Sequence, residues 1–174
     1  MEQKLTTPIT KGIIITLILI AITLCSTFLT TTPNAAFQWV GYIIFIGGVI
    51  LSVWIYGKEI QHQSTFGNYF AHGFKTGAVV TCLMIVFLVI FMNIFPEFKE
   101  RALEEARKGM ERRNASEEQV DKAFEFTKKF FTVFMIGGAL VIYLFLAAVS
   151  ALVGAAITKK NPDTYHHDIN QTGG

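Results

Sequence analysis

The side chains that could bind a metal or transfer protons are few in this sequence, and they gather near the ends of its apolar runs. His62 and His72 fall in one connection, Glu59 lies close to the first of them, and "HHD" occupies residues 166–168. A zinc site needs three or four such ligands at a suitable spacing. This set is incomplete, includes no cysteine and shows no fixed spacing, so solvated histidines explain it better. We expect no metal ligands.

No combination of residues predicts an enzyme either. The chain has no H-E-x-x-H motif, with which a membrane metalloprotease would hold zinc. Four long apolar runs cover residues 12–29, 37–56, 74–95 and 130–157, and apart from Lys75 at the start of the third they contain no Asp, Glu, Lys, Arg or His. Ionisable side chains inside such runs are the usual mark of ion pathways and proton relays. We therefore expect no catalytic residues and no cofactor, and the pattern argues against a coupled transporter.

The composition points to a lipid bilayer. The 174 residues are 52% hydrophobic and their mean hydropathy is +0.45, which gives more apolar surface than a soluble domain of this size would bury. Charged residues make up 16%, below the roughly 25% of globular chains. A net charge of +2, without a basic patch that carries aromatic residues, excludes nucleic acid as the expected partner.

Each of the four runs is long enough to cross the membrane, because about 20 helical residues at 1.5 Å each span roughly 30 Å of hydrocarbon. Pro33 and Asn34, after the first run, predict a tight turn between antiparallel helices. We expect an all-α membrane protein with four transmembrane helices. Residues 1–174 would form a single four-helix domain, ending in a polar, flexible tail at 158–174.

Basic residues near the first run predict its orientation. Lys4 and Lys11 precede it, and lysines beside the first membrane helix usually stay cytoplasmic. The run has 18 residues, whereas the core of a secretory signal has about 7 to 15, so we expect it to be retained. Both termini would then be cytoplasmic. The connection 96–129 argues for the opposite orientation, since it holds nine of the fifteen Lys and Arg residues.

That connection is highly charged and has helical periodicity in both halves. Glu97 and Arg101 begin a series of i,i+4 acid–base pairs, each contributing about 0.2 to 0.5 kcal/mol to a helix. Pro96 suits the first turn of a helix, and Ser116 can cap a second one. We expect a charged helical hairpin outside the membrane, between the third and fourth spans. It would serve as a solvated stalk or as a docking surface for a partner protein.

Residues 65–77, "TFGNYFAHGFKTG", mix aromatic, glycine and polar side chains. On a helix, Asn68, His72 and Lys75 fall on the side opposite to most of the aromatic and glycine residues. We expect a short amphipathic interfacial helix that serves as a hinge into the third span. The structural or interface candidates within it are Phe66, Gly67, Phe70, Gly73, Phe74 and Gly77.

The fourth run carries a small residue at every fourth position. Ala147, Ala151 and Ala155 form this row, and small residues allow membrane helices to approach closely. They are further interface candidates. The row serves either the four-helix bundle, which we favour, or a homodimer.

The order of these features resembles that of a known family. Two closely spaced runs are followed by "GKEIQHQSTFGNYFAHGFKTG", a charged segment with "SEE" and a last run ending in "KKNP". A motif of the type S-F-G-x-x-F-x-x-G-F is met by Thr65, Phe66, Gly67, Phe70, Gly73 and Phe74. The chain thus resembles the bacterial membrane proteins grouped as domain of unknown function 4199. The resemblance implies four helices in a bacterial cell membrane and carries over no catalytic residues.

We therefore predict a non-enzymatic, multi-pass protein of the bacterial inner membrane. Its partners would be the lipid bilayer and either a second copy of itself or another envelope protein, with which it assembles. The uncharged runs, the small-residue row and the charged hairpin motivate this prediction. The alternative is a small transporter or channel subunit in which an oligomer forms the path, and a membrane enzyme comes third.

Overall fold

The computed structural model of the chain describes residues 6–29, 35–112 and 117–159. The regular structure in these ranges is entirely helical, so the all-α prediction is confirmed. The helices are α1 Pro8–Leu29, α2 Ala35–Glu59, α3 Phe66–Ile94, α4 Pro96–Glu111 and α5 Glu117–Thr158. The predicted turn at Pro33 and Asn34, the predicted cap at Ser116 and residues 160–174 of the predicted tail lie outside the described residues, and Thr158, assigned to that tail, is the last residue of α5.

Four of these helices, α1, α2, α3 and α5, are long and apolar enough to cross a membrane. They contain 22, 25, 29 and 42 residues, so even the shortest extends about 33 Å at 1.5 Å per residue. A helix pairs its backbone amides and carbonyls within itself, which is the condition for crossing hydrocarbon. Four such helices in one chain are the architecture of a multi-pass membrane protein.

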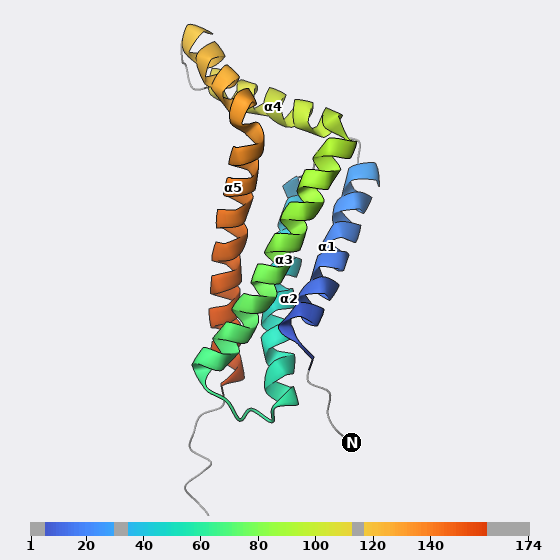
Figure 1. The fold of residues 1–174 in the computed structure, drawn as a ribbon, viewed down its shortest axis with the longest axis vertical. Helices are drawn as coiled ribbons and strands as arrows, with labels where there is room; N and C mark the ends of the chain where they lie inside the picture. Colours follow the sequence, from blue (N-terminus) through green and yellow to red (C-terminus); the bar gives the residue numbers. More distant parts are fainter. Residues whose placement is uncertain (1–5, 30–34, 113–116, 160–174) are drawn as a thin grey trace, which may run out of the picture.

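The four long helices lie side by side, with α2 and α3 in the middle (Figure 1). α2 and α3 contact each other, and each also contacts both α1 and α5. Within the described residues α1 and α5 do not touch each other. The first residue of α1 and the last residue of α5 lie at the same end of the bundle, which we call the terminal end (Figure 1).

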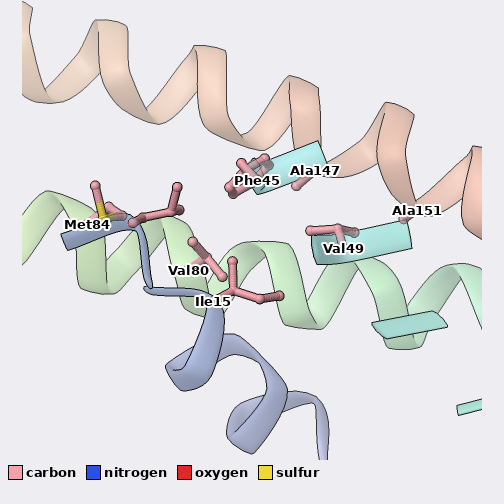
Figure 2. Close-up of a cluster of buried hydrophobic side chains, with 8 residues drawn as sticks. Ile15, Phe45, Val49, Val80, Met84, Ala147 and Ala151 are labelled. Carbon is pink, nitrogen blue, oxygen red and sulfur yellow. The ribbon is translucent and has the colours of Figure 1, made fainter. Parts of the chain in front are cut away.

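The main hydrophobic core lies where α2 and α3 meet the outer helices. Its buried residues come from all four long helices, as Figure 2 shows. Phe45, Val49 and Val80 are fully or almost fully buried, with Ile15 of α1 on one side and Ala147 of α5 on the other. Burial elsewhere on the long helices is low, because most of their apolar side chains point outward, toward the surroundings that lipid would fill.

Within residues 35–112 there is no separate short helix before the third span, so that part of the prediction is wrong. α3 begins at Phe66 and continues to Ile94, and the hydroxyl of Thr65 caps it by accepting a hydrogen bond from the Asn68 amide at 3.3 Å. The stretch expected to be a hinge is the first three turns of one continuous helix. Gly73 and Gly77, which lie in this stretch, pack against the neighbouring helices α2 and α5.

The charged segment after α3 does not continue in the direction of the third span, as the predicted hairpin would. Phe95 leaves the helical conformation at φ −121° and ψ 74°, and Pro96, which has no amide hydrogen, starts α4. α4 then runs across the end of the bundle (Figure 1). Leu103 of α4 and Val120 of α5 are the buried residues of this segment. We call α4 and the first turns of α5, residues 96–112 and 117–134, the charged arm.

Candidate functional site

A buried ion pair joins α1 to α2 at the terminal end. The Lys11 ammonium lies 3.2 Å from Oε2 of Glu59 and 3.4 Å from the carbonyl oxygen of Ser52. Their side chains are only 8% and 15% exposed, respectively. The Thr6 amide donates to the same Oε2 at 3.2 Å, and the Thr6 hydroxyl donates to Oε1. Glu59 thus accepts hydrogen bonds from three donors that belong to the start of the chain.

The two helices place these charges together because they run antiparallel. Lys11 lies in the first turns of α1 and Glu59 is the last residue of α2. Each charge is at the unfavourable end of its own helix, since a helix favours anions at its start and cations at its end. The neighbouring helix offsets this unfavourable interaction for Glu59, because its carboxylate lies beside the start of α1. The pair therefore fixes the register of α1 against α2.

Next to the ion pair, two aromatic rings stack. The rings of Tyr56 in α2 and His72 in α3 are 4.0 Å apart and nearly parallel, at 9°. Tyr69 meets Tyr56 edge-on at 6.1 Å, and the Lys11 ammonium is 5.8 Å from the centre of the Tyr56 ring. His72 is 6% exposed, and its Nε2 has no hydrogen-bond partner within the described residues. The expectation that His72 is solvated is therefore wrong, whereas Asn68 and Lys75, predicted on the same helix face, are exposed.

One turn deeper, hydroxyl groups connect α2 to α3. The oxygens of Ser52 and Thr76 are 3.0 Å apart and both residues are buried. Thr76 donates its proton to the carbonyl oxygen of His72 at 2.9 Å. Ser52 must then be the donor in the Ser52–Thr76 bond, because each hydroxyl has one proton. These two bonds use the hydroxyl protons of both Ser52 and Thr76.

The connection between α2 and α3 is attached to the end of α5. Nδ1 of His62 lies 3.1 Å from the carbonyl oxygen of Thr158, the last residue of α5. Gly57 allows this approach, since a Cβ at position 57 would be 2.1 Å from a methyl carbon of Thr158. Gln61 and His62 both have positive φ, 54° and 60°, which is uncommon for residues other than glycine. The connection is held in a strained conformation by contacts at both of its ends.

Together, these residues form a polar site at the terminal end, and we call Lys11, Ser52, Tyr56, Glu59, His72 and Thr76 the polar cluster. A buried Lys–Glu pair beside a buried histidine could bind or pass a charged group. The same contacts also hold three helices in register. In residues 6–29, 35–112 and 117–159, no three His, Cys, Asp or Glu side chains come close enough to hold a metal ion.

The structure brings four of the predicted interface residues together in the contact between α3 and α5. A Cβ added to Gly73 would be 3.0 Å from Cβ of Ala151, and one added to Gly77 would be 2.4 Å from Cβ of Ala147. Ala155 is fully buried one turn further along α5. These small residues therefore line a helix contact within one chain.

The other predicted interface residues are less enclosed. Phe70 and Phe74 stack with ring centres 5.8 Å apart and are half-buried against the core. Phe66 is 36% exposed, and a Cβ at Gly67 would meet nothing closer than 3.9 Å. These last two lie away from the α3–α5 contact, and the structure assigns them no packing role.

The charged arm carries its own network of ion pairs. Arg107 of α4 contacts Asp121 of α5 at 3.0 Å and Glu111 at 3.1 Å, so it ties the two helices together. Hydrogen bonds and charge from Glu104, and then from Glu105, raise the pKa of Lys108. All these side chains are at least 43% exposed, so each pair stabilises the arm only weakly.

Three phenylalanines stand on the α5 side of the arm. The rings of Phe126 and Phe130 are 4.8 Å apart, and those of Phe126 and Phe134 are 5.8 Å apart. Phe126 is 56% exposed and Phe134 52% exposed. Charged residues flank Phe126 on either side, at Glu125 and Lys128. We call Phe126, Phe130 and Phe134 the phenylalanine patch.

The polar cluster was not predicted from the sequence: Lys11 was used only to orient the first span, Glu59 was weighed only as a metal ligand and Tyr56 was given no role. One signal could have found the pair: in two antiparallel helices joined by a short turn, a residue near the start of the first lies level with one near the end of the second. A lysine and a glutamate occupy those two places.

Comparison with known proteins gives one match. The model of a family described as "Protein of unknown function (DUF4199)" matches residues 10–160 of the chain. No curated protein and no solved structure matches it significantly.

Proposed function

The chain belongs to the family described as protein of unknown function (DUF4199), and from this premise we propose that it is a non-enzymatic membrane protein that acts by assembling with itself or with another envelope protein. The assembly surface is the charged arm with its phenylalanine patch. The bilayer anchors the protein through the four apolar helices.

The observation that carries this proposal is the exposure of the phenylalanine patch among charged residues. Elsewhere on the long helices an exposed phenylalanine is explained by contact with lipid. At Phe126 that explanation is weak, since Glu125, Lys128 and Lys129 surround it and charged side chains avoid hydrocarbon. Exposed aromatic residues rimmed by charge are typical of protein interfaces. The charges of the arm would add specificity to the contact.

Co-purification from the native membrane tests the proposal. We expect a tagged protein, extracted in mild detergent, to carry a second copy or another envelope protein in a fixed ratio. Phe126→Ala should reduce that recovery. Phe145→Ala is the matched control, because Phe145 is 67% exposed but lies in the uncharged part of α5. A monomer with no stable partner would refute the proposal.

The same architecture supports a proposal for the orientation in the membrane. The start of α1 and the end of α5 share one end of the bundle, so the two termini would lie on one side of the membrane. We place that side in the cytoplasm of the inner membrane, because Lys11 lies in the first turns of α1. The charged arm would then be outside. A reporter enzyme that works only in the cytoplasm can be fused near Asn114. Activity of that reporter would reverse this assignment.

A small transporter or channel subunit is the second candidate, and the polar cluster is the observation that favours it. Buried ionisable residues in membrane helices often line the path of an ion or a polar solute. An oligomer would have to supply the rest of that path. Flux in proteoliposomes, lost in Glu59→Gln, would support this function. No flux under any gradient tested would remove it.

A further inference from the structure

A cavity lies between three helices in the half of the bundle away from the terminal end. It has a volume of about 150 Å³ and lies among Thr23 of α1, Met84 and Leu88 of α3, and Ala139 and Tyr143 of α5. Most of its lining residues are half-buried, so the cavity is accessible from outside. It exists because α1 and α5 do not touch each other within the described residues and α3 alone cannot fill the space between them.

The depth of the cavity in the membrane can be read along α3. Leu88 and Met84 lie six and ten residues before Ile94, the end of that helix. At 1.5 Å per residue these distances are about 9 and 15 Å. Half the hydrocarbon thickness of a bilayer is about 15 Å. With the end of α3 near the hydrocarbon boundary, the cavity lies between that boundary and the midplane, beside the acyl chains of one leaflet.

The walls are mostly apolar, and their polar groups are the hydroxyls of Thr23 and Tyr143. The lining side chains from α3 carry no polar group that donates or accepts strongly, and the Thr23 hydroxyl donates its proton to the Leu19 carbonyl at 2.8 Å. The Tyr143 ring packs edge-on against Phe45, with ring centres 5.3 Å apart. A buried water needs two to four polar partners, and an apolar cavity of about this size stays dry and takes up apolar ligands instead. Ions and polar solutes are therefore poor occupants.

We propose that this cavity is a binding site for the hydrocarbon chain of a bilayer lipid. The volume, the apolar walls and the depth agree on that class of ligand, and the membrane supplies it at high concentration. A bound chain would fill the space between α1 and α5 and would contact both of them as well as α3. This site is independent of the charged arm, so it does not rest on the proposed assembly function.

Photolabelling in proteoliposomes tests the site. The probe is a phospholipid with a diazirine in the middle of one acyl chain, and labelled residues are identified by mass spectrometry. Met84 is decisive because it is 9% exposed, so bulk lipid around the protein does not reach it. Val86, on the same helix and 55% exposed, reports that bulk lipid. We expect both residues to be labelled in the unaltered protein.

A larger side chain at Ala139 should then exclude the lipid chain. Ala139→Phe, or the substitution Ala139→Leu with its smaller side chain, should reduce labelling of Met84 severalfold and leave labelling of Val86 unchanged. The matched control is Ala156→Phe, which makes the same change at an exposed position of α5 away from the cavity. Absence of label on Met84 in the unaltered protein, while Val86 is labelled, would overturn the proposal. Equal labelling of Met84 in either folded Ala139 variant would do the same.

Discussion

At the scale of single residues, Lys11 and Glu59 stabilise the protein only as a pair. Both are withdrawn from solvent, and removing a charge from water costs several kcal/mol unless an opposite charge and further hydrogen bonds compensate it. Here the compensation comes from the 3.2 Å contact between them, the Ser52 carbonyl and the donors of Thr6. Removal of one partner should therefore destabilise the protein more than removal of both.

Lys11→Met should lower the free energy of unfolding by roughly 3 kcal/mol, near the low end of the cost of breaking a buried pair, since the Glu59 side chain keeps 15% exposure. The double variant Lys11→Met/Glu59→Leu should recover much of the loss, because no unpaired charge remains. Thermal unfolding in mild detergent, followed by circular dichroism, measures both.

Lys122→Met is the control for that comparison. Lys122 pairs with Glu118 at 2.7 Å, but these side chains are 77% and 80% exposed, so the variant should unfold almost as the unaltered protein does. A double variant at Lys11 and Glu59 that is no more stable than Lys11→Met alone would contradict the role assigned to the pair.

The sequence could not place these residues by hydropathy alone. Lys11 and Glu59 stand just outside the uncharged runs, so a count of apolar residues ends before it reaches them. The position of His72 could not be predicted from the sequence either. An amphipathic pattern assigns it to the polar side of its helix, yet it lies inside because Tyr56 of another helix covers its ring. The contacts that decide its burial are between helices, and a pattern within one helix does not contain them.

At the scale of helices, the α3–α5 contact depends on the absence of side chains. A Cβ at Gly77 would come 2.4 Å from Cβ and 3.2 Å from Cα of Ala147, so it meets backbone that cannot turn aside. Gly137 of α5 offers the contrast, since nothing lies within 4 Å of a Cβ placed there. Both positions are helical, and only one is packed.

Gly77→Ala should therefore destabilise the protein by roughly 1 to 3 kcal/mol, the usual cost of overpacking a tight contact. Gly137→Ala should leave stability unchanged or raise it by up to about 1 kcal/mol, because alanine favours a helix more than glycine does. Melting temperatures in the same detergent compare the two. Equal effects of the two substitutions would show that α3 and α5 do not approach as described.

The connection between α2 and α3 permits a second test at this scale. Gln61 is exposed and has φ of 54°, a conformation that costs a residue with a side chain about 1 to 2 kcal/mol and costs glycine almost nothing. Gln61→Gly should raise the melting temperature. Gln63→Gly, in the same connection but without positive φ, should lower it slightly or leave it unchanged. If Gln63→Gly raises the melting temperature and Gln61→Gly does not, backbone strain at Gln61 does not destabilise the protein.

The sequence predicted most of the helices but not the direction of α4. Uncharged runs located the four long helices, and Pro96 located the break before α4. The break was read as the base of a straight hairpin, although a proline fixes only where a helix starts and not the angle it takes. That angle depends on Phe95 and on Leu103, which packs into the junction of α4 and α5. A separate interfacial helix was predicted because the amphipathic pattern changes near residue 77, but α3 continues without a break from Phe66 to Ile94.

At the scale of the whole molecule, the two ends of the bundle differ in kind. The terminal end is closed by the polar cluster and by the His62–Thr158 contact. The opposite half contains the cavity, and its end carries the charged arm, whose exposed ion pairs and phenylalanine patch lie on α4 and α5. Membership of the family, the four membrane helices and the small-residue row were within reach of the sequence. The functional difference between the two ends required the helices to be placed in space.

The central claim, that the charged arm binds another protein, is tested most directly by photo-crosslinking in the native membrane. A photoreactive phenylalanine analogue replaces Phe126 in one protein and Phe145 in another, both exposed on α5 but one in the arm and the other in the uncharged span. We predict a discrete crosslinked species at position 126, of the mass of two protein chains, and only lipid adducts at position 145. Lipid adducts alone at both positions, in membranes where the protein is intact, would contradict the claim.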